Sequence, residues 1–128
     1  MVTTAEQKII EHGVDRLDYL IQDKQEIDAD DLHHNLYNED YFIIGYYNGE
    51  QFLNEYGTWD AINEVIEYEQ DNFGEVTTDF NGEAIANMLA YIKGQEYLNN
   101  CATLQANWGN RLSVKQLKLI KKELQAQA

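Results

Sequence analysis

Proline is absent from this chain of 128 residues, and cysteine occurs only once, at Cys101. Without proline the sequence lacks its strongest helix breaker. A single cysteine excludes an intrachain disulfide, as is typical of proteins in a reducing compartment. No apolar run approaches the roughly 20 residues that span a bilayer, and the first residues lack the layout of a secretory signal. We therefore expect a soluble, cytoplasmic protein.

Positive charge is also scarce. No lysine or arginine lies between Lys24 and Lys93, whereas that window holds 16 of the 23 acidic residues, and the net charge is −14. Five of the nine basic residues follow residue 110. A surface with such one-sided charge repels nucleic acid and membranes and attracts basic partners. We expect no direct binding of nucleic acid or membrane, and a basic, nucleic-acid-binding protein as the partner.

Apolar residues at helical spacing predict an all-α fold. A hydrophobic fraction of 44% is normal for a globular protein, so residues 1–128 are expected to form one domain. The pattern predicts a compact bundle of five to six amphipathic helices. Their expected positions are about 5–25, with Thr4 and Gln7 as a capping box, 31–37, 58–74, 82–100, and a basic C-terminal helix at about 113–126, with Ser113 and Gln116 as a second capping box.

Residues 41–56 fit two structures. Asn48-Gly49 after an apolar run is typical of a β-hairpin turn. The run 41–47 does not alternate, however, and Phe42, Leu53 and Tyr56 recur at helical spacing. The pattern favours a helix that ends at Gly57, with a minor β-hairpin as the alternative.

The helix expected to begin near Trp59 carries a row of carboxylates. Its members lie within about 80° of one another around the axis and span about 22 Å. This acidic row consists of Asp60, Glu64, Glu67, Asp71 and Glu75, and Tyr68 borders it. No cation interrupts it within the helix, although like charges four residues apart destabilise a helix. Its spacing is of the same order as the roughly 3.4 Å between phosphates along a DNA strand.

Two interpretations of the acidic row remain open: a surface that occupies a protein's basic groove, or a solvated helix face. The apolar residues expected to face the core on the same helix are Trp59, Ile62, Val65, Ile66 and Phe73. Tyr68 could add an aromatic anchor to a partner-binding site made of the row. We expect no catalytic residues, no metal site and no cofactor.

Other residues carry an alternative function. Glu69 falls on the apolar side of that helix, either as a structural hydrogen-bonding group or as an acid of shifted pKa. His33-His34 lies among acidic residues that include Glu39 and Asp40. The alternative is therefore a small metal-dependent enzyme or accessory protein that uses Glu69 and His33/His34. A third reading is a structural or assembly protein, and a homodimer is possible.

The basic C-terminal residues also have two interpretations. Lys115, Lys118 and Lys122 share one face of the last predicted helix. They could bind nucleic acid, but the negative charge of the whole chain favours salt bridges to the acidic body.

Three stretches between about His33 and Gly94 resemble small acidic proteins encoded by tailed bacteriophages. They read HHNLYNEDYFIIGYY, EYEQDNFGEVTTDFN and ANMLAYIKGQE, and the resemblance covers about half the chain. It implies no assigned chemistry. It implies a context in which early phage proteins disable a host machine, as antirestriction and anti-CRISPR proteins do by mimicking DNA charge. By that analogy we expect a non-enzymatic inhibitor, in the host cytoplasm, of a CRISPR effector, restriction enzyme or transcription factor.

Overall fold

The protein is mostly helical, which confirms the predicted all-α class. The computed structural model describes residues 3–38, 42 and 47–128. Within these residues the elements are α1 (Thr4–Gln22), β1 (Ile27–Asp28), α2 (Ala29–Leu36), α3 (Gly49–Tyr56), α4 (Thr58–Phe73), α5 (Gly82–Asn99), α6 (Ala102–Ala106), β2 (Arg111–Leu112) and α7 (Val114–Gln125).

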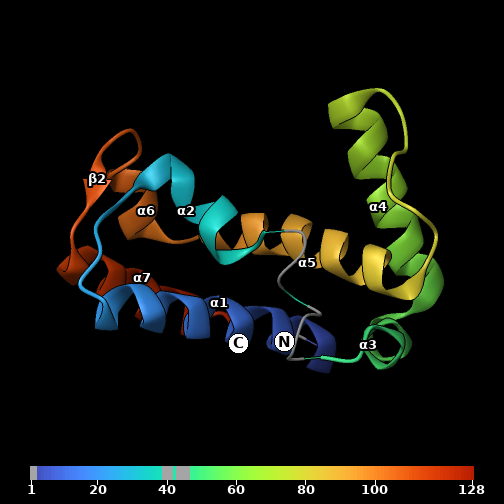
Figure 1. Cartoon of the computed structure of the whole chain (residues 1–128), viewed down its shortest axis with the longest axis horizontal. Helices are drawn as coiled ribbons and strands as arrows, with labels where there is room; N and C mark the ends of the chain where they lie inside the picture. Colours follow the sequence, from blue (N-terminus) through green and yellow to red (C-terminus); the bar gives the residue numbers. More distant parts are fainter. Residues whose placement is uncertain (1–2, 39–41, 43–46) are drawn as a thin grey trace.

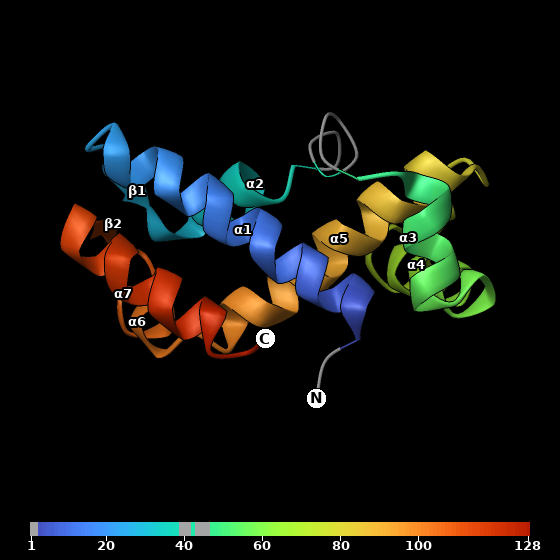
Figure 2. The ribbon, with the colours of Figure 1, turned by 90° about the horizontal axis from the view of Figure 1, so that it is seen from below.

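The helices are arranged along one long axis with α5 near its centre. α1 packs lengthwise against α7, while α5 contacts α1, α2, α3 and α4. Figure 1 shows α4 standing up from one end of the molecule, whereas α6, β2 and α7 lie at the opposite end. The view in Figure 2 confirms this separation of α4 from α7 along the long axis.

The centre of the core is a tyrosine held between two helical glycines. The ring of Tyr37, which is buried, lies against Gly13 of α1 and Gly94 of α5. A Cβ at Gly94 would lie 2.3 Å from the ring, and one at Gly13 would lie 2.1 Å from its hydroxyl oxygen. The Tyr37 hydroxyl donates a hydrogen bond of 2.9 Å to the Ile9 carbonyl oxygen. Both glycines therefore serve close packing inside helices, where glycine otherwise costs stability.

Most predicted helix ends lie within a few residues of the observed ones. The second capping box is confirmed, with Ser113 as the N-cap of α7 and Gln116 as its N3 residue. The first box is shifted by one residue, because Thr3 rather than Thr4 accepts from Glu6 and Glu6 bonds back. Of the two residues before α5 that the sequence offers as N-caps, Asn81 and Asp79, Asn81 caps the helix through a bond from the Ala84 amide.

The ambiguous segment contains a helix. Asn48 accepts a hydrogen bond from the Gln51 amide and so begins α3, which excludes a hairpin turn at Asn48-Gly49. Gly57 ends α3 with φ of 110° and is also the N-cap of α4, in place of the predicted Thr58. The predicted helix or strand over 41–47 lies largely outside the described residues.

Three short elements were not predicted. β1 pairs antiparallel with β2, with Ile27 opposite Leu112 and Asp28 opposite Arg111. The five-residue helix α6 lies between α5 and β2. Two-residue strands carry no periodicity, so their pairing depends on the tertiary fold.

Candidate functional site

The acidic row lies on α4, which projects from one end of the molecule (Figure 1). Gly74 ends α4 in a left-handed conformation, with φ of 76°. Asp60, Glu67 and Asp71 are exposed, and no ion pair to any of them occurs within the described residues. We call these three carboxylates the acidic face of α4. Glu75 follows the end of the helix, so its predicted place in the helical row is wrong.

Glu64 is the partly neutralised member of the row. The Nζ atom of Lys93 lies 3.0 Å from a Glu64 carboxylate oxygen and 3.5 Å from one of Glu96. The Tyr56 hydroxyl donates to the other Glu64 oxygen. Burial alone would lower the pKa of Lys93, but the two carboxylates raise it above its ordinary value. The expectation of a row without a cation is thus wrong at Glu64, because the lysine comes from α5.

Two open grooves flank the row and add carboxylates that the sequence pattern missed. One groove, of about 260 Å³, is lined by Glu64, Glu67, Tyr68, Asp71, Asn72, Ile92 and Glu96. The other, of about 420 Å³, is lined by Thr3, Glu6, Tyr56, Asp60, Asn63, Glu64 and Glu67. Glu64 and Glu67 therefore form a ridge between the grooves. Glu6 and Glu96 come from α1 and α5, so no pattern within α4 could reveal them.

Tyr68, the predicted aromatic anchor, is only partly accessible. Its side chain is half-buried in the first groove, and its ring packs edge-on against Phe73. The hydroxyl donates to the Gln95 side chain at 3.5 Å, which is a weak bond. Tyr68 contributes part of a groove wall and is less accessible than Phe73 or Trp59.

α4 is rotated relative to the orientation that its apolar residues predict. It buries Ala61, Val65 and Glu69, whereas Trp59 is 76% exposed and Phe73 is 55% exposed. The reason is that α4 is covered mainly by α5 and α3. The small side chain of Ala61 allows a close approach on that side. Two of the residues predicted to face the core are therefore exposed aromatics.

Glu69 is a structural group. One carboxylate oxygen accepts from the amides of Thr77, at 2.6 Å, and Thr78, at 3.1 Å, and both threonine hydroxyls also donate to the carboxylate. Burial alone would raise the pKa of Glu69, but these donors lower it below its ordinary value. The carboxylate stays charged and ties the segment after α4 back onto the helix, which favours the structural reading over an acid of raised pKa.

The histidine pair is bound to Tyr91 of α5. His33 Nε2 lies 2.9 Å from the Tyr91 carbonyl oxygen, and His34 Nδ1 lies 3.4 Å from its hydroxyl. Burial lowers the pKa of His33. His34 and Glu69 line one pocket of about 300 Å³. In the described part of the chain, however, no three His, Cys, Asp or Glu residues are placed to hold a metal ion. Glu39 and Asp40 lie outside that part.

The basic C-terminal residues divide into two groups. Lys121 Nζ lies 2.6 Å from Asp18, and Arg111 pairs with Glu26 and Asp28, as expected of a counterweight to the acidic body. The predicted salt bridges of Lys115, Lys118 and Lys122 are absent within the described residues, and all three side chains are exposed. α7 buries its opposite side against α1, so these three lysines point away from the body.

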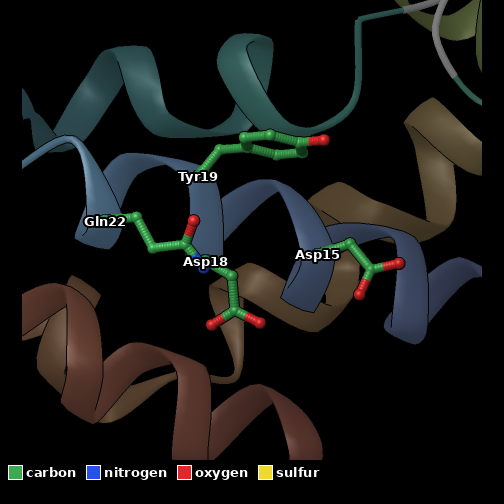
Figure 3. A pocket seen from close by; sticks show the side chains of 4 residues that line it. All are labelled: Asp15, Asp18, Tyr19 and Gln22. Carbon is green, nitrogen blue, oxygen red and sulfur yellow. The ribbon is translucent and has the colours of Figure 1, made fainter.

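A further depression lies on α1 and is lined by Asp15, Asp18, Tyr19 and Gln22 (Figure 3). In Figure 3 the Asp18 carboxylate points toward α7, where Lys121 binds it, while Tyr19 lies on the other side of the helix. All four lining residues belong to one helix. The depression assembles no groups from different elements and is a weaker candidate than α4.

Comparisons with family models, curated proteins and solved structures gave no match. The resemblance to phage proteins stays a prediction. Among the helices of the described residues, none combines the length and apolar character needed to cross a membrane.

Proposed function

We propose that the protein is a non-enzymatic, phage-type inhibitor that binds a basic, nucleic-acid-binding host protein through the acidic face of α4. The observation that carries this proposal is the exposure of Asp60, Glu67 and Asp71 on a projecting helix. No cation of the described residues pairs with them. A basic groove of another protein would supply the missing positive charge.

The dimensions suit a groove that holds a nucleic-acid backbone. Asp60 and Asp71 are eleven residues apart, or about 16 Å along the helix. Glu6 and Glu96 widen the negative surface through the flanking grooves. Host CRISPR effectors, restriction enzymes and transcription factors carry basic grooves of this kind. Charge steering would speed association and make it sensitive to salt.

The exposed aromatics add a contact that charge alone does not supply. Trp59 and Phe73 are exposed at the two ends of α4, about 100° and 140° around the helix axis from the acidic face. Large aromatic side chains are common anchors of protein interfaces. A protein partner that reaches around α4 would contact Trp59 as well as the carboxylates.

The test compares three immobilised proteins in a pull-down from host lysate. They are the wild type, Asp60→Asn/Glu67→Gln/Asp71→Asn, and a control on α1, Glu11→Gln/Asp15→Asn/Asp23→Asn, which removes the same charge. Glu64 is left unchanged because Lys93 already holds it. Wild type and control should retain a basic protein that about 0.5 M NaCl or added duplex DNA releases, since salt screens exposed charges. Equal retention by the α4 variant would show that the acidic face only solvates the helix.

A further inference from the structure

The outer side of α7 is an unpartnered basic face. Lys115, Lys118 and Lys122 follow one another at steps of three and four residues and are exposed. Leu119 lies among them and is 44% exposed. Steps of three and four place side chains on one stripe of a helix. This stripe, which we call the basic face of α7, contrasts with Lys121, which turns inward to Asp18.

The acidic face of α4 offers three carboxylates, one for each lysine, over a longer stretch of helix. Asp60, Glu67 and Asp71 lie at steps of seven and four, and Glu64 between the first two is already paired with Lys93. Lys118 and Lys122 can therefore face Glu67 and Asp71 at the same step of four on another helix, while Asp60 lies about 10 Å further along α4. α4 and α7 lie at opposite ends of the long axis in both ribbon views, so the two faces cannot meet within one molecule.

We propose that the basic face of α7 docks on the acidic face of α4 of a second copy of this chain. The contact is heterologous, because each molecule offers one face of each kind. Such head-to-tail contacts produce open chains unless the rotation closes a ring. The exposed Leu119 within the basic face supplies apolar contact area.

Charge favours a second copy over nucleic acid as the occupant of α7. The body behind the three lysines gives the chain a net charge of −14. A nucleic acid would be repelled by most of the surface, whereas a second copy can turn its most negative helix toward the lysines. The proposal goes beyond the proposed function, since α7 takes no part in binding a host protein. Both partners use the acidic face of α4, so a second copy and the host protein compete for it.

The first test is sedimentation equilibrium of the wild type over a range of concentrations. At low salt the average mass should rise above the monomer mass of 14.9 kDa as concentration increases. At about 0.5 M NaCl it should return to the monomer mass, because that salt screens exposed charges within a few ångström. A mass that stays at the monomer value in low salt overturns the proposal.

The second test uses two variants that each lack one face. Asp60→Asn/Glu67→Gln/Asp71→Asn lacks the acidic face, and Lys115→Gln/Lys118→Gln/Lys122→Gln lacks the basic face. Each alone should be monomeric, while an equal mixture should form a dimer and nothing larger, because only one complementary pair of faces remains. Self-association of either variant alone, or no dimer in the mixture, contradicts a heterologous contact.

A control variant distinguishes the effect of losing the three lysines from the effect of a more negative net charge. Gln22→Glu/Gln25→Glu/Gln105→Glu lowers the net charge by three, as the lysine variant does, but leaves both faces intact and should associate like the wild type. Labelled duplex DNA is the probe for the other occupant. DNA binding by the wild type that the lysine variant loses would assign the basic face to nucleic acid instead. The lysine variant should still retain the host protein in the pull-down, so this proposal can fail while the proposed function stands.

Discussion

The helices at the two ends of the molecule, α4 and α7, attach to the body in different ways. α7 buries Leu117, Ile120 and Leu124 completely and begins with a two-sided capping box. α4 buries Ala61, Val65 and the charged Glu69, and its first residues have no side-chain cap. Its aromatic residues Trp59 and Phe73 remain largely exposed. Apolar burial therefore stabilises α7, while α4 leaves much of its apolar surface outside.

Polar contacts compensate for the limited burial of α4. Glu69 binds the threonines of the following segment, and Glu64 binds Tyr56 of α3 and Lys93 of α5. The contacts are specific but involve few residues. α7 is therefore anchored in the body by its apolar side, whereas α4 leaves most of its residues at the surface and is held by a few polar contacts.

The largest effect should come from the core that both ends share. Gly94→Ala would place a Cβ 2.3 Å from the Tyr37 ring, so the ring or a helix must move. Overpacking of this kind costs about 3 kcal/mol. We expect the melting temperature to fall by about 10 °C, with both ends unfolding together. Gly82→Ala in the same helix is the control, because its Cβ would come no closer than 3.6 Å to any neighbouring atom, which is ordinary van der Waals contact. A Gly94 variant as stable as the control would contradict this packing.

The second effect is a pH dependence of the free energy of unfolding, which arises from a buried histidine in the core. His12 is 1% exposed and packs against Tyr37 and Phe42. Burial, and next the charge of Arg16, lower its pKa to about 4. The unfolded chain, with an ordinary histidine pKa of about 6.5, then binds the proton more readily, so stability is full above pH 6.5 and falls toward pH 4. The loss should be about 2 kcal/mol at pH 5.

Urea unfolding of wild type and His12→Gln at pH 7 and pH 5 measures this contribution. The variant should be less stable at pH 7 but should lose less stability between the two values. His33, whose pKa is also lowered, is common to both proteins and cancels in the comparison. Equal losses in the two proteins would assign the pH dependence to other groups.

An effect of similar size, but confined to one end of the molecule, should follow Glu69→Gln. Glutamine does not carry the negative charge that the threonine donors stabilise in Glu69. Charge-assisted hydrogen bonds of this kind contribute about 2 kcal/mol to the free energy of unfolding. Hydrogen exchange should become faster in α4 and in residues 75–81, while α1 and α7 keep their protection. Leu117→Ala provides the opposite case and should speed exchange in α7. Uniform loss of protection in the Glu69 variant would mean that α4 unfolds only together with the body.

The smallest effect is expected from Lys93→Met. Removing this partly exposed ion pair should change stability by no more than about 1 kcal/mol. It also releases Glu64 and Glu96, which makes the surface around the acidic face more negative. Retention of the host protein in the pull-down should then persist to a higher salt concentration. Earlier release of the host protein would show that Lys93 itself contacts the partner.

Local sequence patterns predict where the helices begin and end. Contacts between segments far apart in the sequence determine the geometry of the candidate site. Ser113 and Asn81 could be recognised as caps because a cap needs only its own next three residues. The rotation of α4 could not be predicted, since it depends on which face α5 covers. The pairing of Glu64 depends on Lys93, 29 residues later in the chain. The fit of Tyr37 between two glycines likewise depends on the meeting of three separate segments.

The central claim is that the acidic face of α4 occupies a nucleic-acid-binding groove. Its most direct test is displacement of labelled duplex DNA from the host protein recovered in the pull-down, followed by fluorescence anisotropy. Wild type and the α1 control should displace the DNA at similar concentrations, and Asp60→Asn/Glu67→Gln/Asp71→Asn should need at least about tenfold more, equivalent to about 1.4 kcal/mol. Displacement by this variant at the wild-type concentration would contradict the claim.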